Sequence, residues 1–347
     1  MEIRFYNQDM DFLGPMENQT SLIWTRKYSE PGCFELYTPI TEANLRLTQM
    51  GNLIWMKGCD EAAIIEDRKL EESDVKNEIT AKGRFLSSYM DRRLIKGTVH
   101  FSGKVEEAMR QLLSSVEPIP RVQLGELQGF EEEVEFQATY KNLLTYEKKL
   151  AKSAGLGFRF RPDFDKKVIY FEVYRGIDRT TAQDVNNRVT FSESYNNLNN
   201  TIYRENDQLF KNVAIVGSAG EGSERTFVQV GEATGLELRE LFVDAKDISP
   251  DGLTTEQFHA ALRTRGEEAL ADNIISRSFE CDTGADANFK YKEKYDLGDL
   301  VTVKKKAWSI TEKKRMTEAK EVYEYGGRRI EPTFGDGLPE TIDWSDT

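Results

Sequence analysis

Few side chains in this sequence could do chemistry. Its 347 residues include two histidines, His100 and His259, and three cysteines, Cys33, Cys59 and Cys281. A Ser-His-Asp or Cys-His site would need one of the histidines, and neither lies in a nucleophile-elbow or thiol-protease context. The cysteines are odd in number and form no C-x-x-C pair, so they indicate neither a disulfide framework nor a zinc site. We interpret them as buried, inert thiols.

One glycine-rich loop has the outline of a phosphate-binding loop. Gly217–Ser223 follows an apolar run and has Gly-x4-Gly spacing. Ser223, however, stands where such a loop requires a lysine for the phosphates, so the nucleotide-binding interpretation fails. The glycines instead predict a turn between two strands, running from Val216 to Thr226, in which they supply positive φ angles.

Neighbouring carboxylates are abundant. They include Glu131–Glu133, Asp163 with Asp165, and Glu71 with Glu72. A glycosidase needs one carboxyl held protonated in a dry pocket, and these lie in highly charged stretches that favour solvation. No EF-hand spacing is present. The sequence therefore predicts no catalytic, cofactor-binding or metal-binding residues and no enzymatic activity.

Composition and charge exclude several further classes. Hydrophobic residues make up 39% of the chain and charged residues 31%, as in folded globular proteins. The net charge of −13 argues against a protein that wraps nucleic acid. The most basic stretches, Lys304–Lys306 and Lys313–Arg315, flank apolar residues in a strand-like pattern and are typical of protected strand edges. No signal peptide or membrane-spanning segment is expected.

Three windows have helical periodicity, namely 103–116, 138–154 and 254–275. The last opens with a capping box formed by Thr254 and Gln257. Elsewhere short apolar runs alternate with turn residues, which is typical of strands. We therefore expect an α+β, β-dominated fold.

The change of periodicity along the chain predicts four regions. Residues 1–98 form a β-rich domain, 99–187 a small α+β domain, and 188–325 a second β-rich domain with one long helix. Residues 326–347 are expected to be an extended C-terminal arm, because they are rich in glycine, proline and acidic residues.

Several segments resemble, in order, the siphovirus and prophage tail-hub family. They are Trp24–Leu36, Gly51–Ile54, Ala63–Glu66, Ala81–Leu86, Asp91–Ile95, Leu262–Leu270, Tyr295–Val303 and Pro332–Gly335. The resemblance spans nearly the whole chain, but its motifs are structural turns and strand edges. It therefore points to a role and not to an active site.

The resemblance implies a structural hub protein of a phage tail, or of a phage-derived tail-like particle, assembled in the bacterial host cytoplasm. Such a protein forms a ring, with a homotrimer expected, that joins the tail tube to the tip, spike or baseplate. The family implies that 1–98 and 188–325 are paired β-barrel-like tube domains, although no convincing sequence repeat relates them. No sequence-specific nucleic-acid partner is expected.

Two alternatives from other functional classes stay open. The chain could be a tail-associated glycan hydrolase, or a carbohydrate-binding module for host recognition. A hydrolase should release reducing ends from host cell wall, and a recognition module should bind whole cells unaided. A hub should do neither, but should associate with tube or spike proteins.

Overall fold

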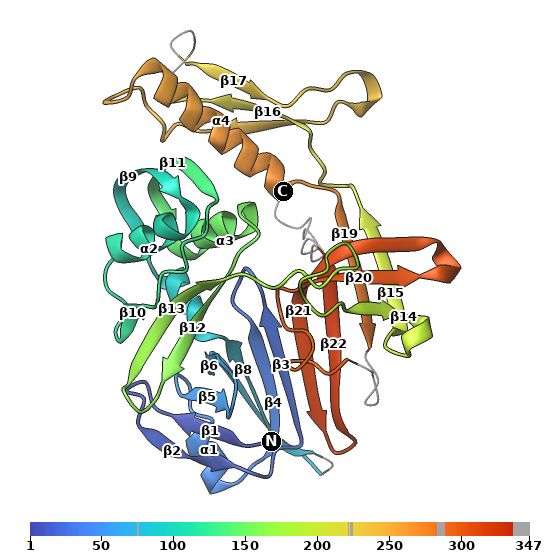
Figure 1. Ribbon diagram of the computed structural model, residues 1–347. Coiled ribbons are helices and arrows are strands. Elements are labelled where there is room, and N and C mark those ends of the chain that lie inside the picture. Colours follow the sequence, from blue (N-terminus) through green and yellow to red (C-terminus); the bar gives the residue numbers. More distant parts are fainter. Residues whose placement is uncertain (75, 221, 223–224, 283–288, 336–347) are drawn as a thin grey trace.

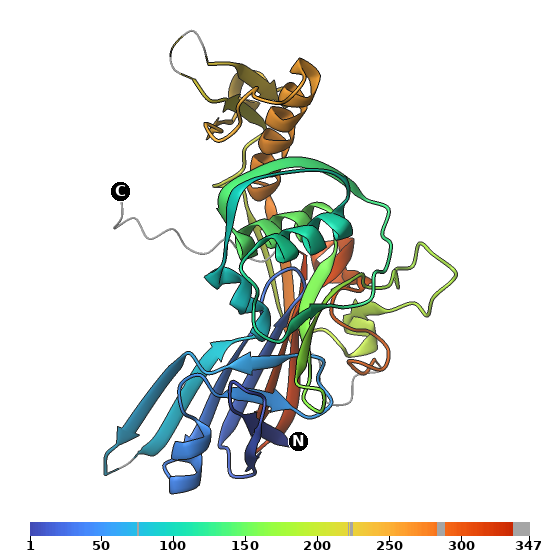
Figure 2. The same ribbon diagram turned by 90° about the vertical axis from the view of Figure 1, so that its left-hand side faces the viewer.

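The computed structural model describes residues 1–347 except 75, 221, 223–224, 283–288 and 336–347 (Figure 1). The fold is β-dominated with few helices, as predicted. Three parts are stacked along the long axis of the molecule (Figure 2). The N- and C-terminal strands form the lower part, an α+β unit lies above them, and a small lobe stands at the top. No helix in the described part of the chain is long and apolar enough to span a membrane.

The largest sheet joins strands from both ends of the chain. Its main order is β15-β19-β22-β21-β3-β4-β8-β7, and β20 pairs with β21 and with β14. The bounds are β3 (Ser21–Lys27), β4 (Cys33–Pro39), β7 (Asp67–Glu72), β8 (Asn77–Arg84), β14 (Thr190–Ser192), β15 (Asn199–Asn206), β19 (Ser276–Asp282), β20 (Leu300–Lys305), β21 (Ile310–Glu324) and β22 (Gly327–Gly335).

The two β-rich regions meet where β3 pairs with β21. This antiparallel pairing runs from Lys27 opposite Glu318 to Leu22 opposite Tyr323. Alternation of side chains buries Leu22 and Trp24 on one face of β3. Regions 1–98 and 188–325 therefore share one continuous sheet.

A closed barrel is not detected in the described strands. The main path of the largest sheet ends in β15 and β7, and the smaller sheets are open as well. Alternating apolar residues predict which face of a strand is buried, but not whether two edge strands meet. The sequence could therefore indicate the strands without indicating closure.

A smaller N-terminal sheet packs beside the large one and has the order β2-β1-β5-β6. Its strands are β1 (Ile3–Tyr6), β2 (Phe12–Met16), β5 (Leu53–Met56) and β6 (Ala62–Ile64). A six-residue helix, α1 (Glu42–Leu47), precedes β5 and was not predicted, because one and a half turns are too short for a visible period. The 3-10 turns are η1 (Leu86–Arg92), η2 (Glu193–Tyr195), η4 (Gly235–Glu237) and η5 (Lys306–Trp308).

The α+β unit follows. Its elements are β9 (Leu94–Lys104), α2 (Val105–Ser115), β10 (Val122–Leu124), β11 (Glu133–Asn142), α3 (Leu143–Ser153), β12 (Gly157–Asp163) and β13 (Val168–Tyr174). The predicted helix at 103–116 is confirmed as α2. The helix predicted for 138–154 begins later, because 138–142 extend β11 against β9, and the Asn142 side chain then caps α3 by accepting from the Thr145 amide.

The top lobe consists of β16 (Val213–Gly217), β17 (Phe227–Val230), β18 (Glu240–Asp244) and α4 (Thr255–Asp272). The sheet order is β17-β16-β18, and α4 covers one face (Figure 1). The predicted strand-to-strand turn after Val216 is confirmed, since β16 and β17 pair antiparallel. The capping box of Thr254 and Gln257 is also confirmed.

The prediction of an extended C-terminal arm is wrong for residues 327–335. These residues form β22, which pairs with β21 and β19 and buries Ile330 and Phe334 in the core. Tyr325 and Gly326 form the turn of this hairpin, and Gly327, at φ +114°, opens β22 opposite Glu324, so the two glycines do not mark the end of the folded part. The rest of the predicted arm, 336–347, lies outside the described residues.

Candidate functional site

A buried arginine forms the centre of a polar cluster that joins distant parts of the chain. Arg26 on β3 is 1% exposed. Its Nε donates to Glu61 Oε2 at 2.9 Å, and its Nη1 donates to the Tyr291 hydroxyl at 2.8 Å and to Asp296 Oδ1 at 3.0 Å. Glu61 lies between β5 and β6, whereas Tyr291 and Asp296 lie between β19 and β20. One side chain therefore ties the N-terminal strands to the C-terminal region.

Burial and the neighbouring groups shift the pKa values of Arg26 and Glu61 in opposite directions. Burial alone would lower the pKa of Arg26, but Tyr291, Glu61 and Asp296 outweigh it and hold the pKa well above its ordinary value. Burial raises the pKa of Glu61, and Arg26 opposes that shift. Burial also raises the pKa of Tyr291, which keeps its proton. The buried charge of Arg26 is therefore paired with carboxylates and hydrogen-bonded. Such an arrangement has a structural role.

A second arginine extends the cluster into the α+β unit. Arg159 on β12 donates to Asp60 Oδ2 at 2.6 Å and to Glu172 Oε2 at 2.9 Å. Its guanidinium lies 5.0 Å from the centre of the Tyr174 ring. We call Arg26, Arg159 and their partners the ionic junction. Because Asp60 adjoins Glu61, the junction connects the N- and C-terminal regions of the lower part to the α+β unit.

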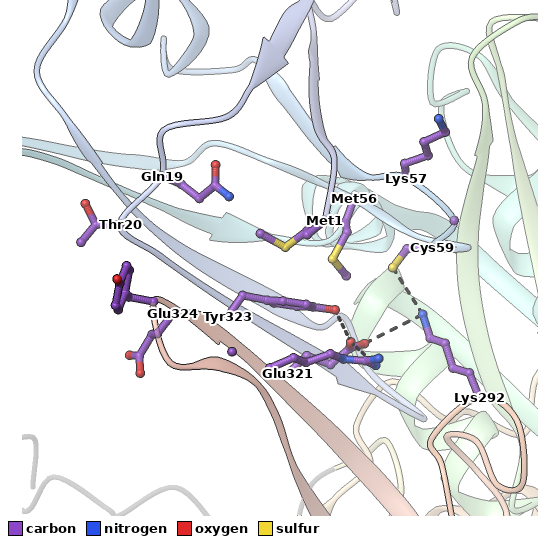
Figure 3. Close-up of a pocket in the computed structure, with 14 residues that line it drawn as sticks. Met1, Gln19, Thr20, Met56, Lys57, Cys59, Lys292, Glu321, Tyr323 and Glu324 are labelled. Atoms are coloured by element: carbon purple, nitrogen blue, oxygen red, sulfur yellow. Dashed lines mark hydrogen bonds and ion pairs between the residues drawn. The ribbon is translucent and has the colours of Figure 1, made fainter. Parts of the chain in front are cut away.

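A buried carboxylate on β21 lies close to this junction. Glu321 accepts from the Tyr323 hydroxyl at 2.6 Å and from Arg328 Nη2 at 2.7 Å (Figure 3). Lys292 Nζ lies 3.9 Å from its other oxygen and also donates to Cys59 Sγ at 3.4 Å. These contacts again connect residues far apart in the sequence.

These side chains border a surface pocket of about 820 Å³ (Figure 3). Charged, aromatic and sulfur-containing side chains mix in its wall. The lining residues are Met1, Gln19, Thr20, Met56, Lys57, Gly58, Cys59, Lys292, Glu321, Tyr323, Glu324, Tyr325, Gly327 and Arg328. No local sequence pattern indicates this pocket, because its lining comes from five separate segments.

The pocket is poorly suited to nucleophilic catalysis. Burial raises the pKa of Cys59, and the nearby Lys292 only partly offsets this effect, so the thiol is mainly protonated at neutral pH. His100 on β9 and His259 on α4 are far from Cys59 in the sequence, and neither lines the pocket. Among the described residues, no group of three or more histidine, cysteine or acidic side chains could hold a metal ion.

The predicted burial of the cysteines is correct for two of the three. Cys59 and Cys281 are buried, but Cys33 is exposed. Cys33 opens β4, in which Phe34 and Leu36 point to the core, so period-two alternation turns Cys33 outward.

The three groups of carboxylates considered as possible glycosidase residues lie on separate elements. Glu71 pairs with Lys69 and Lys76 on the β7–β8 hairpin, Asp163 pairs with Lys166, and Glu132 pairs with Arg175. The structure therefore does not bring these three groups together as an acid and a nucleophile.

The basic stretches are partly neutralised. Lys305 pairs with Glu193 at 2.5 Å, Lys314 pairs with Glu312 at 3.1 Å, and Arg315 Nη1 donates to the Gly298 carbonyl at 2.6 Å. Both stretches lie on the β20–β21 hairpin, but Lys304 is opposite Ser192 on β14 and Thr311 on β21, so the strand-edge interpretation is wrong for Lys304.

Arg26, Glu61 and Glu321 were not predicted from the sequence as functional residues. A signal for Arg26 was present, since it continues the alternation that buries Leu22 and Trp24 on β3. A charged residue at an inward strand position needs a partner. The partner residues could not be named, because Tyr291 is 265 positions away.

Comparison with known proteins agrees with this architecture. The chain matches the family described as Siphovirus ReqiPepy6 Gp37-like protein over residues 2–336. No curated protein matches it. The match confirms the resemblance to tail proteins noted from the sequence.

Solved structures of tail proteins share the fold over almost the whole chain. A tail protein from Neisseria meningitidis MC58 is 13% identical with a TM-score of 0.57, covering 96% of this chain and 95% of that chain. The 43 kDa tail protein of prophage MuSo2 from Shewanella oneidensis has the same identity and TM-score, with 96% and 98% covered. Prophage tail protein gp18 from Listeria monocytogenes EGD-e is 11% identical with a TM-score of 0.54, with 97% and 95% covered. The chain belongs to the Siphovirus ReqiPepy6 Gp37-like family of phage tail proteins.

Proposed function

We propose that this chain is a structural hub subunit of a phage tail or a phage-derived tail-like particle. In this proposal it forms a homotrimeric ring that joins the tail tube to the tip, spike or baseplate, after assembly in the cytoplasm of the bacterial host. The observation that carries the proposal is the family match over residues 2–336, together with a tail-protein fold over 96% of the chain.

The shared sheet supports a role in a ring. A threefold ring can match a sixfold tube only if each subunit presents two similar surfaces to it. We assign these surfaces to the two β-rich regions 1–98 and 188–325, with 99–187 between them. The pairing of β3 with β21 holds the two regions in one rigid unit, which such a subunit needs.

The ionic junction supports a mechanical role. Arg26 and Arg159 connect strands from three regions of the chain through buried or half-buried ion pairs. Removing one partner of such a pair is costly, so the regions should move as one body. A subunit that transmits force between a tube and a tip benefits from this stiffness.

The test of the proposal is assembly with neighbouring tail proteins. The purified chain should form a trimer-sized species, measured by light scattering, when it is mixed with the tube or spike protein of the same particle. Persistent monomers in that mixture would contradict the hub assignment.

Two activity assays address the other functional classes. The purified chain should release no reducing ends from host cell wall, and it should not bind whole cells unaided. Release of reducing ends by the chain, lost in a carboxylate variant that stays folded, would favour a glycan hydrolase. Saturable cell binding would favour a carbohydrate-binding module.

A further inference from the structure

The top lobe has one covered and one uncovered sheet face. α4 packs on the face that carries Ala214, Val216 and Val230. The other face carries Phe227 and Phe242, each 55% exposed. The Arg225 guanidinium lies between the two rings, at 5.6 and 5.3 Å from their centres. The lobe therefore presents an aromatic surface on the side away from its helix.

Acidic side chains border one end of this face. Glu240 lies on the same face of β18 as Phe242, since the two are separated by one residue. Glu232 and Glu237 lie in the connection from β17 to β18, where Leu236 is fully exposed. None of these three glutamates has an ion-pair partner among the described residues. We call Phe227, Phe242 and the three glutamates the lobe face.

The β20–β21 hairpin presents the opposite combination. Trp308 in its η5 turn is 45% exposed, and its ring centre lies 6.3 Å from that of Phe279 and 5.1 Å from Lys305 Nζ. Lys304, Lys306 and Lys313 are exposed on the same hairpin, and none of the three pairs with a described carboxylate. Lys304 and Lys313 are diagonal neighbours, because Lys313 is opposite Thr302. We call Trp308 and these lysines the basic hairpin.

We propose that the lobe face of one copy binds the basic hairpin of the next copy. Trp308 packs on Phe227 and Phe242, while the lysines approach the glutamates. Aromatic side chains prefer the centre of an interface, and opposite charges at its rim set the register. This inference rests on the proposed ring, for which it names the surfaces that meet.

A second copy is the occupant that the charges favour. The chain carries both halves of a complementary pair, an aromatic surface with an acidic border and an indole with a basic border. The two surfaces differ and lie on separate parts of the molecule, the lobe and the lower sheet (Figure 1). Contacts between unlike surfaces generate a ring when the rotation closes.

The size of the lobe face shows that this contact is part of a larger one. Three strands of about five residues cover roughly 200 Å², at about 3.3 Å per residue and about 4.8 Å between strands. A stable interface buries about 800 Å² on each partner. The lobe and the hairpin therefore set which surfaces meet, and other contacts between neighbours add area.

The experiment exchanges the charges of the two surfaces. The lobe variant carries Glu237→Lys and Glu240→Lys, and the hairpin variant carries Lys304→Glu and Lys306→Glu. Sedimentation velocity at low salt, from about 1 to 100 µM protein, gives the association constant. Each variant alone should associate at least about tenfold more weakly than the wild type, because like charges then meet.

The chain that carries all four substitutions is the decisive variant. It has the wild-type net charge, its exchanged charges match again, and its association should return to the wild-type level. The matched control is Lys96→Glu with Lys294→Glu, which alters the net charge as the hairpin variant does but at exposed sites elsewhere. It should associate like the wild type.

Mixing the two single-surface variants tests closure as well. In the mixture unlike variants are the favoured neighbours, so closed rings with an even number of copies are favoured. Mixed dimers or larger even species should predominate over closed trimers. A mixture in which trimers predominate would overturn the contact.

Two results overturn the inference without touching the proposed function. One is wild-type association that both single-surface variants retain. The other is a wild-type chain that stays monomeric up to about 100 µM yet assembles with tube protein. Failure of the proposed function would instead show as persistent monomers in the presence of tube and spike proteins.

Discussion

Arg26 and Glu61 form a buried ion pair, with Arg26 Nε 2.9 Å from Glu61 Oε2 and both side chains 2% exposed. The pair connects β3 to the loop before β6, and through Tyr291 it reaches the C-terminal region. These residues are therefore energetically coupled. The effect of substituting one of them on stability depends on whether its partner keeps a buried charge.

Arg26→Met should destabilise the chain by about 3 to 5 kcal/mol, because it leaves Glu61 buried without its cation. Urea unfolding followed by tryptophan fluorescence measures the change. The double variant Arg26→Met with Glu61→Gln should recover part of this loss, because no buried charge is left. A double variant less stable than Arg26→Met would contradict the ion pair as the source of the effect.

Glu147 on α3 should be a destabilising group. It is fully buried, and neither of its carboxyl oxygens has a hydrogen-bond partner among the described residues. Burial raises its pKa well above 4.5. Glu147→Met should raise the free energy of unfolding by about 1 to 3 kcal/mol at neutral pH.

The same residue predicts the sign of a pH effect. Because the folded state holds the Glu147 proton more tightly than the unfolded state does, its contribution to stability is complete below about pH 4.5. It is lost as the pH rises toward the higher folded pKa. The stability gained by Glu147→Met should therefore grow between pH 4.5 and neutral pH in matched unfolding curves. A gain that is constant over that range would contradict the assignment.

Gly266 should be required where α4 crosses the lobe sheet. A Cβ at this position would lie 2.7 Å from Val230 Cγ2 and 2.9 Å from Val216 Cγ2. Gly266→Ala should therefore destabilise the lobe by about 1 to 3 kcal/mol, although alanine favours helices. Adding Val230→Ala should make space and recover part of the loss. Thermal unfolding of the full chain measures both variants, and a stabilised Gly266→Ala would refute the close approach.

The histidines should be dispensable. His100→Ala, His259→Ala and each single cysteine-to-alanine variant should leave particle assembly and infectivity largely intact, because none has an assigned chemical role. Loss of infectivity in a variant that stays folded would reopen the enzymatic alternative.

The channel wall of the assembled ring should be neutral to acidic. Lysines facing the channel would bind DNA phosphates with release of counterions, and several such contacts would hold a passing genome. The net charge of −13 is compatible with a wall that repels phosphate within about 8 Å. An electrostatic map of the ring measures this. A wall dominated by Lys304–Lys306 and Lys313–Arg315 would contradict the prediction.

Local elements were predictable where one periodicity dominated. The Thr254 capping box and the apolar face with Phe258 and Leu262 predicted α4 almost to its ends. The start of α3 was misplaced, because 138–142 pair with β9, and a distant partner strand does not show in local periodicity. Gly326 and Gly327 were read as the end of the fold for the same reason.

Long-range relationships were not predictable from the residues alone. The pairing of β3 with β21 joins positions about 300 residues apart, and no local pattern specifies it. The ionic junction depends on that pairing, so its residues were missed together. The resemblance indicated the family of the chain, which the family match over residues 2–336 confirms, but it indicated no contact.

The central claim is that the chain forms a ring at the end of a tail tube. An electron cryo-microscopy reconstruction of the intact particle tests it most directly. We predict three copies of this chain in a closed ring that contacts the last tube ring on one side and the tip, spike or baseplate on the other. Density for the chain as isolated copies on peripheral fibres, with another protein closing the tube, would contradict the account.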